Sequence, residues 1–188
     1  MELKPLIVLL IMSIGLAIVT ANADFVKKNY PNGIYKFDLK LLDGKKLNLG
    51  GLKGRPLLLV NMATRCGFTG QLDDLEALYK KYKKGGQGLA IIGIPSNDFG
   101  RQTPEKGFAI GEFCRLKYGV TFPITEKIKI KGSEKSDIFR YLSLVRGNQE
   151  VRWNFEKFLF NKEGHFIGHF RSGEKPLNGN LESIIKNL

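Results

Sequence analysis

Two kinds of apolar pattern alternate along the chain, and their spacing predicts an α/β fold. Leu57–Met62 and Gly88–Ile94 are short, almost unbroken apolar runs, which are typical of central strands that are buried on both faces. Between them, Gln71–Lys84 carries apolar residues at helical spacing. A strand, a helix and a strand at this distance predict a βαβ unit with two parallel strands. We therefore expect a single α/β layer structure around a central sheet of four or five strands.

Weaker patterns on either side of this unit predict the rest of the fold. We expect strands before it at Ile34–Leu39 and Lys46–Leu49, and a second helix after it at Pro104–Tyr118. Thr69 is a candidate N-cap for the first helix. The remaining expected elements are a short strand at Lys127–Ile130, a helix at Asp137–Leu144, a hairpin of Phe158–Phe160 and His165–Phe170, and a closing helix at Leu181–Leu188.

The first residues of the chain have the features of a secretory signal peptide. Lys4 provides a weak basic region, Leu6–Thr20 is almost entirely apolar, and Ala21-Asn22-Ala23 fits a small-x-small cleavage site. We therefore expect residues 1–23 to be a signal peptide and residues 24–188 to be a single domain that is exported to a periplasm or secreted. The apolar run is short for a spanning helix, which needs about 20 residues, but an uncleaved membrane anchor is the alternative.

The composition adds a basic surface to this picture. The net charge is +12, and 43% of the residues are hydrophobic, which is enough for a proper core. A basic surface favours anionic membranes or acidic partners, although a solvated, lysine-rich surface is the simpler interpretation. No arginine-rich run with interleaved aromatic residues argues for nucleic acid. We therefore expect no nucleic-acid partner and, at most, peripheral membrane contact.

One of the two cysteines lies in the turn that follows the first buried strand. Cys66 is at the carboxyl end of that strand and beside a helix N-terminus, where the helix dipole favours a thiolate. In an exported protein, however, two cysteines are by default interpreted as a structural disulfide. Cys66 and Cys114 are too far apart in the sequence for a metal-ligand pair, and His165 and His169 are distant from both, so we expect no bound metal. Cys66 is thus a candidate nucleophile, with the structural disulfide as the alternative.

Four separated blocks of sequence provide a more specific signal. They are Asn61–Thr69, Pro95–Gln102, Phe113–Pro123 and Trp153–Phe158. Their content, order and spacing resemble the glutathione peroxidase family, in its cysteine-containing, thioredoxin-dependent and phospholipid-hydroperoxide-like branch. The resemblance extends from about Ile34 to the C-terminus. It implies a thioredoxin-like fold, with a central mixed sheet flanked by helices, and the reduction of hydroperoxides.

The resemblance also implies roles for individual residues. The catalytic tetrad of the family falls on Cys66, Gln102, Trp153 and Asn154, and its second, resolving cysteine falls on Cys114. It implies no bound cofactor, because the electrons come from a thiol reductant, either a thioredoxin-like protein or glutathione. The insertion that builds the interface of tetrameric members is absent before Trp153, so we expect a monomer.

The chemistry of these side chains agrees with that reaction. A thiolate that attacks an O–O bond needs deprotonation, access and donors for the developing oxyanion. Gln102 and Asn154 offer amide N–H groups, Trp153 offers an indole N–H, and Arg65 would add positive charge beside Cys66. A sulfenic acid formed on this cysteine condenses with a second thiol, and the chain contains only one other. We therefore expect a redox-active disulfide and an antioxidant role in the response to oxidative stress.

The chain departs from the family pattern in places. Ser96 stands where the family often has a further cysteine, which leaves the redox couple unambiguous. Asp98 adds a negative charge that would disfavour a thiolate if it were close, although a turn-forming side chain that points away is the simpler interpretation. Gly107 and Gly111 are poor helix formers, so they would ease a loosening of the helix that bears Cys114.

Two other classes of function use the same residues. The first is a redox relay or sensor that passes oxidation to a partner protein, but the absence of a Cys-x-x-Cys pair argues against a general dithiol exchanger. The second is a non-catalytic module of thioredoxin fold with a structural disulfide and a basic face on a membrane.

Overall fold

The structure is a computed structural model that describes residues 23–188. Its strands are β1 (Asp38–Lys40), β2 (Lys46–Asn48), β3 (Leu57–Met62), β4 (Ala90–Pro95), β5 (Lys157–Phe160) and β6 (Phe166–Phe170). Its helices are α2 (Gln71–Tyr82), α3 (Phe108–Tyr118), α4 (Asp137–Leu144) and α5 (Asn180–Ile185), with short 3₁₀ helices η1 (Gly33–Lys36), η2 (Leu49–Leu52) and η3 (Lys84–Gly86).

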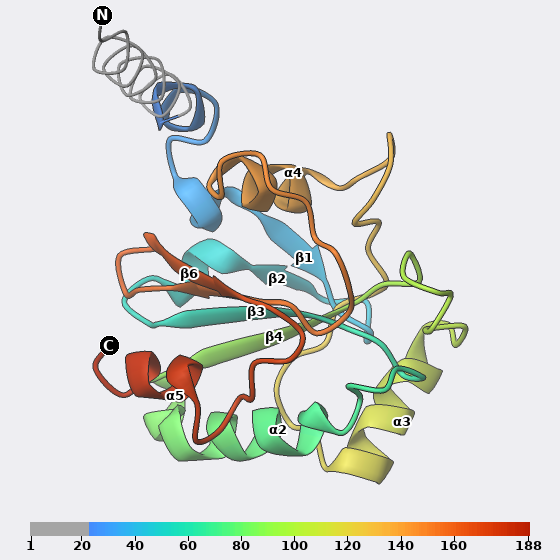
Figure 1. The fold of residues 1–188 in the computed structure, drawn as a ribbon. Coiled ribbons are helices and arrows are strands. Elements are labelled where there is room, and N and C mark those ends of the chain that lie inside the picture. Colours follow the sequence, from blue (N-terminus) through green and yellow to red (C-terminus); the bar gives the residue numbers. More distant parts are fainter. Residues whose placement is uncertain (1–22) are drawn as a thin grey trace, which may run out of the picture.

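Four of the strands form one mixed sheet that is covered on both faces (Figure 1). The strand order is β4-β3-β5-β6, in which β3 runs parallel to β4 and antiparallel to β5. The strands β5 and β6 are an antiparallel hairpin, and β1 and β2 form a separate antiparallel pair. The helices α2, α3 and α5 lie on one side of the sheet and α4 lies on the other.

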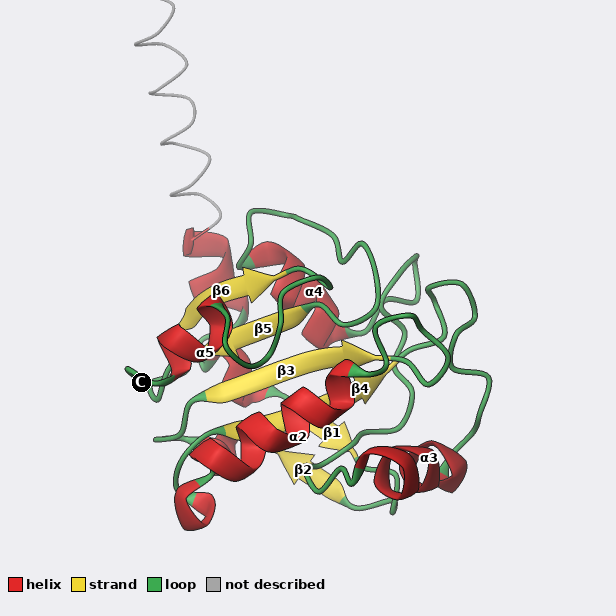
Figure 2. Ribbon diagram, turned by 60° about the horizontal axis from the view of Figure 1, so that its bottom comes forward, coloured by secondary structure: helices red, strands yellow, loops and turns green. Residues whose placement is uncertain are grey.

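The central strand β3 divides its side chains between two hydrophobic clusters. Leu58, Val60 and Met62 pack into a cluster with residues of α2, α3 and α5, which we call the α2-side cluster. Leu57 and Leu59 pack on the opposite face with residues of α4 and β1. Figure 2 shows α2 lying along β3 and β4 on the first face. All six residues of β3 are buried, and each fully buried leucine stabilises the fold by about 2 kcal/mol.

These observations confirm the predicted centre of the fold. The strand β3 and the helix α4 have the expected bounds, and β4 pairs with β3 in parallel, as the βαβ pattern predicts. The expected hairpin near the C-terminus is present as β5 and β6. The sheet has four strands, which is within the expected range.

Two predicted strands are wrong in whole or in part. The first residues of the expected strand Ile34–Leu39 form η1, because Gly33, with a φ of +53°, turns the chain there and Tyr35 N–H donates to the Asn32 carbonyl. The strand begins only at Asp38. The segment Lys127–Ile130 is irregular, because its backbone donors go to the end of β4 and to a side chain rather than to a strand ladder.

The second helix begins four residues later than predicted. Gly107 has a φ of +50° and precedes α3, so it is not a residue of the helix interior. Gly111 lies inside the helix, where an added Cβ would come within 3.1 Å of Leu42. Gly119 ends α3 in the left-handed conformation, as expected for a glycine at a helix C-terminus.

The expected signal peptide, residues 1–23, lies outside the described residues except for its last position. Within residues 23–188, no helix is both long and apolar enough to cross a bilayer.

Lys157 on β5 is a lysine buried in the core, so its titration reports the cost of placing a positive charge there. Its side chain is fully buried, and its Nζ donates to the carbonyls of Glu174 (2.6 Å) and Ser172 (3.4 Å). Burial lowers the pKa of Lys157 from 10.5 to about 8, although the Glu174 and Glu156 carboxylates oppose this shift.

We predict that the free energy of unfolding of the wild type, relative to that of Lys157→Met, rises between pH 8 and 10.5. In that window the unfolded lysine binds a proton that the folded one has lost, so rising pH favours the folded state, by about 3 kcal/mol across the window. Urea unfolding at several pH values measures this difference. The exposed Lys162→Met is the control, and a difference that does not change with pH would contradict the prediction.

Candidate active site

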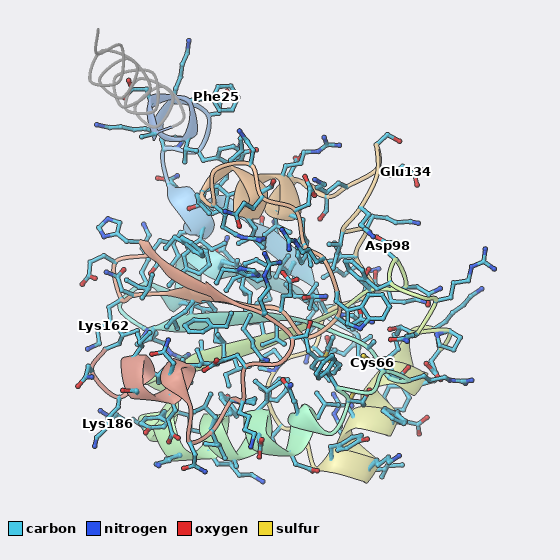
Figure 3. All side chains as sticks on the ribbon, in the orientation of Figure 1. Phe25, Cys66, Asp98, Glu134, Lys162 and Lys186 are labelled. Atoms are coloured by element: carbon cyan, nitrogen blue, oxygen red, sulfur yellow. The ribbon has the colours of Figure 1, made fainter. Side chains whose placement is uncertain are left out.

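Cys66 lies in the turn between β3 and α2 and is half-buried against the α2-side cluster (Figure 3). Its N–H donates to Thr69 Oγ1 (2.9 Å), and this hydroxyl donates to the Ala63 carbonyl (3.1 Å). The Phe68 N–H points at the Cys66 sulfur at 3.5 Å. The prediction of Thr69 as N-cap of α2 is therefore wrong. Gly70 holds that position without a side-chain bond, and the Thr69 hydroxyl instead closes the cysteine turn.

Gln102 joins the loop after β4 to the cysteine turn. Its carbonyl accepts the N–H groups of Arg65 (2.9 Å) and Thr64 (3.2 Å), the two residues that precede Cys66. Its side-chain Oε1 accepts a hydrogen bond from Asn154 Nδ2 (3.0 Å). Since the amide oxygen is used in this way, the Gln102 NH₂ group remains as a donor, and it bonds no other atom within residues 23–188.

Asn61, near the end of β3, holds the third segment of the site. Its side chain is fully buried, its Nδ2 donates to the Trp153 carbonyl (3.1 Å) and its Oδ1 accepts from Glu156 N–H (3.0 Å). Its own carbonyl accepts from Phe155 N–H (2.6 Å). Phe155 has a φ of +63°, which is rare for a bulky residue, so these bonds hold a strained turn in place.

Trp153 and Asn154 occupy this turn in different environments. The Asn154 side chain is fully buried, and its Oδ1 has no hydrogen-bond partner among the described residues. The Trp153 side chain is 40% exposed and packs edge-on against Phe99, with ring centroids 6.0 Å apart. Backbone and side-chain contacts thus connect Trp153, Asn154 and Gln102 to the turn that bears Cys66.

Arg65 is directed to a carboxylate. Its Nε and Nη2 lie 2.8 Å from Glu105 Oε1, and the Thr64 hydroxyl bonds the other oxygen of Glu105. Burial alone would raise the pKa of Glu105, but the Thr64 and Arg65 hydrogen bonds hold it below its ordinary value. The Arg65 side chain is mostly exposed, so this ion pair contributes less than about 1 kcal/mol. The support of a Cys66 thiolate by Arg65 remains a prediction. The Glu105 carboxylate already compensates the positive charge of Arg65.

Cys114 lies on α3 and is completely buried in the α2-side cluster, against which Cys66 also packs. Both cysteines are free thiols. Burial raises the pKa of Cys114 to about 12, although the Arg115 charge opposes the shift. The Cys114 thiol is therefore protonated and shielded in this conformation.

Asp98 is turned toward another segment. Its Oδ2 accepts the N–H groups of Ile130 (2.6 Å) and Lys131 (3.1 Å), and Lys129 Nζ lies 3.4 Å from Oδ1. Burial alone would raise the pKa of Asp98, but these donors hold it below its ordinary value. Figure 3 shows Asp98 apart from Cys66. These contacts agree with the expectation that Asp98 points away from Cys66, but its carboxylate binds the segment around Ile130 and does not form a turn of its own.

Three supporting residues of the site were not predicted in these roles from the sequence: Asn61, Thr69 and Glu105. Asn61 had a detectable signal, because it is the one polar residue in a buried apolar strand and a buried amide needs partners. Glu105 depends on tertiary contacts with Thr64 and Arg65, whereas the bonds of Thr69 to Cys66 and Ala63 are local. Among the described residues, no group of three His, Cys, Asp or Glu side chains is placed to hold a metal ion.

We predict that an alkylating reagent modifies Cys66 at least about tenfold faster than Cys114 in the native protein, because Cys114 is buried and its pKa is about 12. Timed labelling with iodoacetamide and mass spectrometry of the two peptides measures the rates. Labelling in denaturant is the control and should remove the difference. Faster native labelling of Cys114 would contradict the described packing.

Comparison with known proteins gives this site a context. Residues 34–143 match the family model described as "Glutathione peroxidase". The chain is 42% identical over 158 residues to "Glutathione peroxidase homolog BsaA" of Staphylococcus aureus, covering 82% of this chain and 98% of that protein. It is 41% identical over 157 residues to "Glutathione peroxidase-like peroxiredoxin 2" of Saccharomyces cerevisiae, covering 80% and 96% of the two chains.

A solved structure extends the similarity to three dimensions. The crystal structure of T. cruzi GPX1 matches with a TM-score of 0.66 and 28% identity, over 83% of this chain and 95% of that one. The match confirms the predicted thioredoxin-like fold, with its mixed sheet flanked by helices.

Proposed function

Because this chain belongs to the glutathione peroxidase family, we propose that it is a thiol peroxidase that reduces hydrogen peroxide and organic or lipid hydroperoxides through Cys66. The most direct support is the junction of three distant segments beside the cysteine turn. The Gln102 carbonyl accepts hydrogen bonds from the backbone of this turn. The Gln102 side chain accepts a hydrogen bond from the Asn154 side chain. No bound cofactor is needed, because peroxidases of this family take electrons from thiols.

In the first step, the Cys66 thiolate attacks one oxygen of the hydroperoxide. A sulfur–oxygen bond forms, the O–O bond breaks, and the leaving oxygen takes a proton and departs as water or an alcohol. Cys66 becomes a sulfenic acid. Gln102 and Trp153 assist as oriented N–H dipoles that stabilise the thiolate and the developing oxyanion. Asn154, whose Nδ2 donates to Gln102 Oε1 (3.0 Å), holds the Gln102 amide in its orientation. The free NH₂ of Gln102 suits this role.

In the second step, the Cys114 thiol condenses with the sulfenic acid to form a disulfide and water. Because Cys114 is completely buried, this step requires α3 to loosen and expose it, so that the two Cα atoms lie within about 7 Å of each other, as a disulfide needs. The positive φ of Gly107 and of Gly119 marks both ends of α3 as points where the chain turns without strain.

A thiol reductant then restores both cysteines. One thiol of a dithiol protein attacks the disulfide, and its second thiol releases the reduced peroxidase while the reductant becomes oxidised. Support for a thioredoxin-like protein comes from the peroxiredoxin names of the yeast relatives and from the second cysteine in this chain. Glutathione is the alternative reductant.

The setting of the reaction is part of the proposal. Residues 1–23 act as a signal peptide, or as an uncleaved anchor, and bring a single domain of residues 24–188 to a periplasm or the cell exterior. The enzyme works there as a monomer and draws on a reductant of that compartment. Its net charge of +12 supports peripheral contact with anionic membranes, where lipid hydroperoxides form.

We predict that the reduced wild type loses two free thiols within seconds of one equivalent of hydrogen peroxide. Cys66→Ser loses none, because the attacking sulfur is gone. Cys114→Ser loses one, because its sulfenic acid has no partner, and a dimedone adduct on Cys66 identifies it. Thiol titration and mass spectrometry measure these outcomes.

Steady-state turnover separates the parts of this proposal. With a thioredoxin-like dithiol as reductant, both variants should fall to the background rate. Retained turnover in Cys66→Ser would overturn the peroxidase mechanism. Retained turnover in Cys114→Ser alone would remove the resolving role of Cys114 and leave the peroxidase intact.

A further inference from the structure

Glu156 is a buried carboxylate that faces the turn of Trp153 and Asn154. It exposes 1% of its side chain. Its Oε1 accepts the N–H groups of Arg152 (2.9 Å) and Trp153 (3.3 Å), and its own N–H donates to Asn61 Oδ1 (3.0 Å). The carboxylate therefore holds the turn through two N–H groups, while Asn61 of the strand β3 holds it through the Trp153 carbonyl.

Two basic side chains bind this carboxylate: His169 lies in the strand β6, and Arg171 directly follows that strand. His169 Nε2 lies 2.5 Å from Oε2, and Arg171 Nη1 lies 3.2 Å from Oε1. The His169 side chain is only 11% exposed, and its ring packs on the Phe158 ring with the two centroids 5.2 Å apart. Burial alone would raise the pKa of Glu156, but the His169 hydrogen bond and the Arg152 N–H, with the Arg171 charge, hold it below its ordinary value.

The Trp153 ring depends on this backbone support because its own packing is light. The side chain is 40% exposed, and its one aromatic partner among the described residues is Phe99. The backbone of Trp153 is bonded at both ends, with its N–H on Glu156 and its carbonyl on Asn61. These two bonds thus fix the backbone position from which the indole ring packs against Phe99.

We propose that Glu156, held by His169 and Arg171, is a positioning residue that fixes the Trp153–Asn154 turn in the geometry needed for peroxide cleavage. It bonds the turn and acts on the reaction only through it. This inference rests on the proposed peroxidase function and adds a set of residues to which the sequence assigns no role, His169 among them.

The chain provides a direct reporter of this geometry, because Trp153 is its only tryptophan. In Glu156→Ala, the turn loses the acceptor of two N–H groups. We expect its tryptophan emission to shift to longer wavelength and acrylamide to quench it more strongly. The second-order rate constant of Cys66 oxidation by hydrogen peroxide should fall about a hundredfold, because a displacement of about 1 Å at a reacting geometry has an effect of this size.

Glu156→Gln is the conservative variant and has nearly the same shape. It keeps an oxygen for the turn and loses the charge that His169 and Arg171 hold, so we expect a decrease of about tenfold and a smaller spectral change. It also keeps the test decisive if the alanine variant does not fold.

A matched control carboxylate lies in another part of the fold. Glu182 on α5 accepts the Asn178 N–H (2.7 Å) and pairs with Lys81 (2.8 Å), but it has no contact with the site. Glu182→Gln should lower the melting temperature and leave both the tryptophan emission and the oxidation rate constant unchanged.

The outcomes separate this inference from the function on which it rests. A wild type that does not consume peroxide would overturn the proposed function. An active wild type, together with Glu156→Gln that keeps the wild-type rate constant and emission, would overturn the positioning role alone. A loss of rate in Glu182→Gln equal to that in Glu156→Gln would also overturn it, because general destabilisation would then explain both.

Discussion

The buried amide of Asn61 is the constraint on which the assembly of the site depends. It lies on the central strand, only a few residues before Cys66, and it bonds the carbonyl of Trp153 and the N–H of Glu156. Each buried polar group left without a partner costs about 1–3 kcal/mol, so the turn that follows residue 152 cannot move away from β3 without a large penalty. A core interaction thereby fixes the distance between the segments that carry Cys66 and Trp153, which are far apart in the sequence.

The two cysteines lie in environments that match two different tasks. Cys66 is half-exposed on a turn closed by the Thr69 hydroxyl, with the Phe68 N–H directed at its sulfur. Cys114 is buried on a helix whose outer face exposes Phe108 and Leu116. The first arrangement favours immediate reaction with a small peroxide. The second keeps the Cys114 thiol protonated and shielded, which fits its proposed role as a resolving thiol that α3 releases.

The sequence predicted the centre of the fold because its signals there are local. The unbroken apolar run of β3 and the helical spacing of α2 need no knowledge of distant contacts. The prediction of a strand at Lys127–Ile130 is wrong because the structure there depends on a distant contact. The Asp98 carboxylate accepts the N–H groups of Ile130 and Lys131, so these groups do not join a strand ladder.

The same distinction applies to the site. The residues expected to act directly were identified by resemblance, from motifs that are each local in the sequence. The roles of Glu105 and Glu156 arise from hydrogen bonds to segments that come together only in the folded chain. Such roles leave little trace in spacing or composition, apart from a polar residue such as Asn61 within a buried apolar strand.

The rate at which hydrogen peroxide oxidises Cys66 tests the central claim most directly, measured in the Cys114→Ser background so that only the first step is observed. The account predicts a second-order rate constant far above that of a free cysteine. It also predicts a fall of roughly 10²–10³-fold in Gln102→Ala, the size expected when an oriented oxyanion donor is lost. A constant no larger than that of free cysteine, or one that does not respond to Gln102→Ala, would contradict the account.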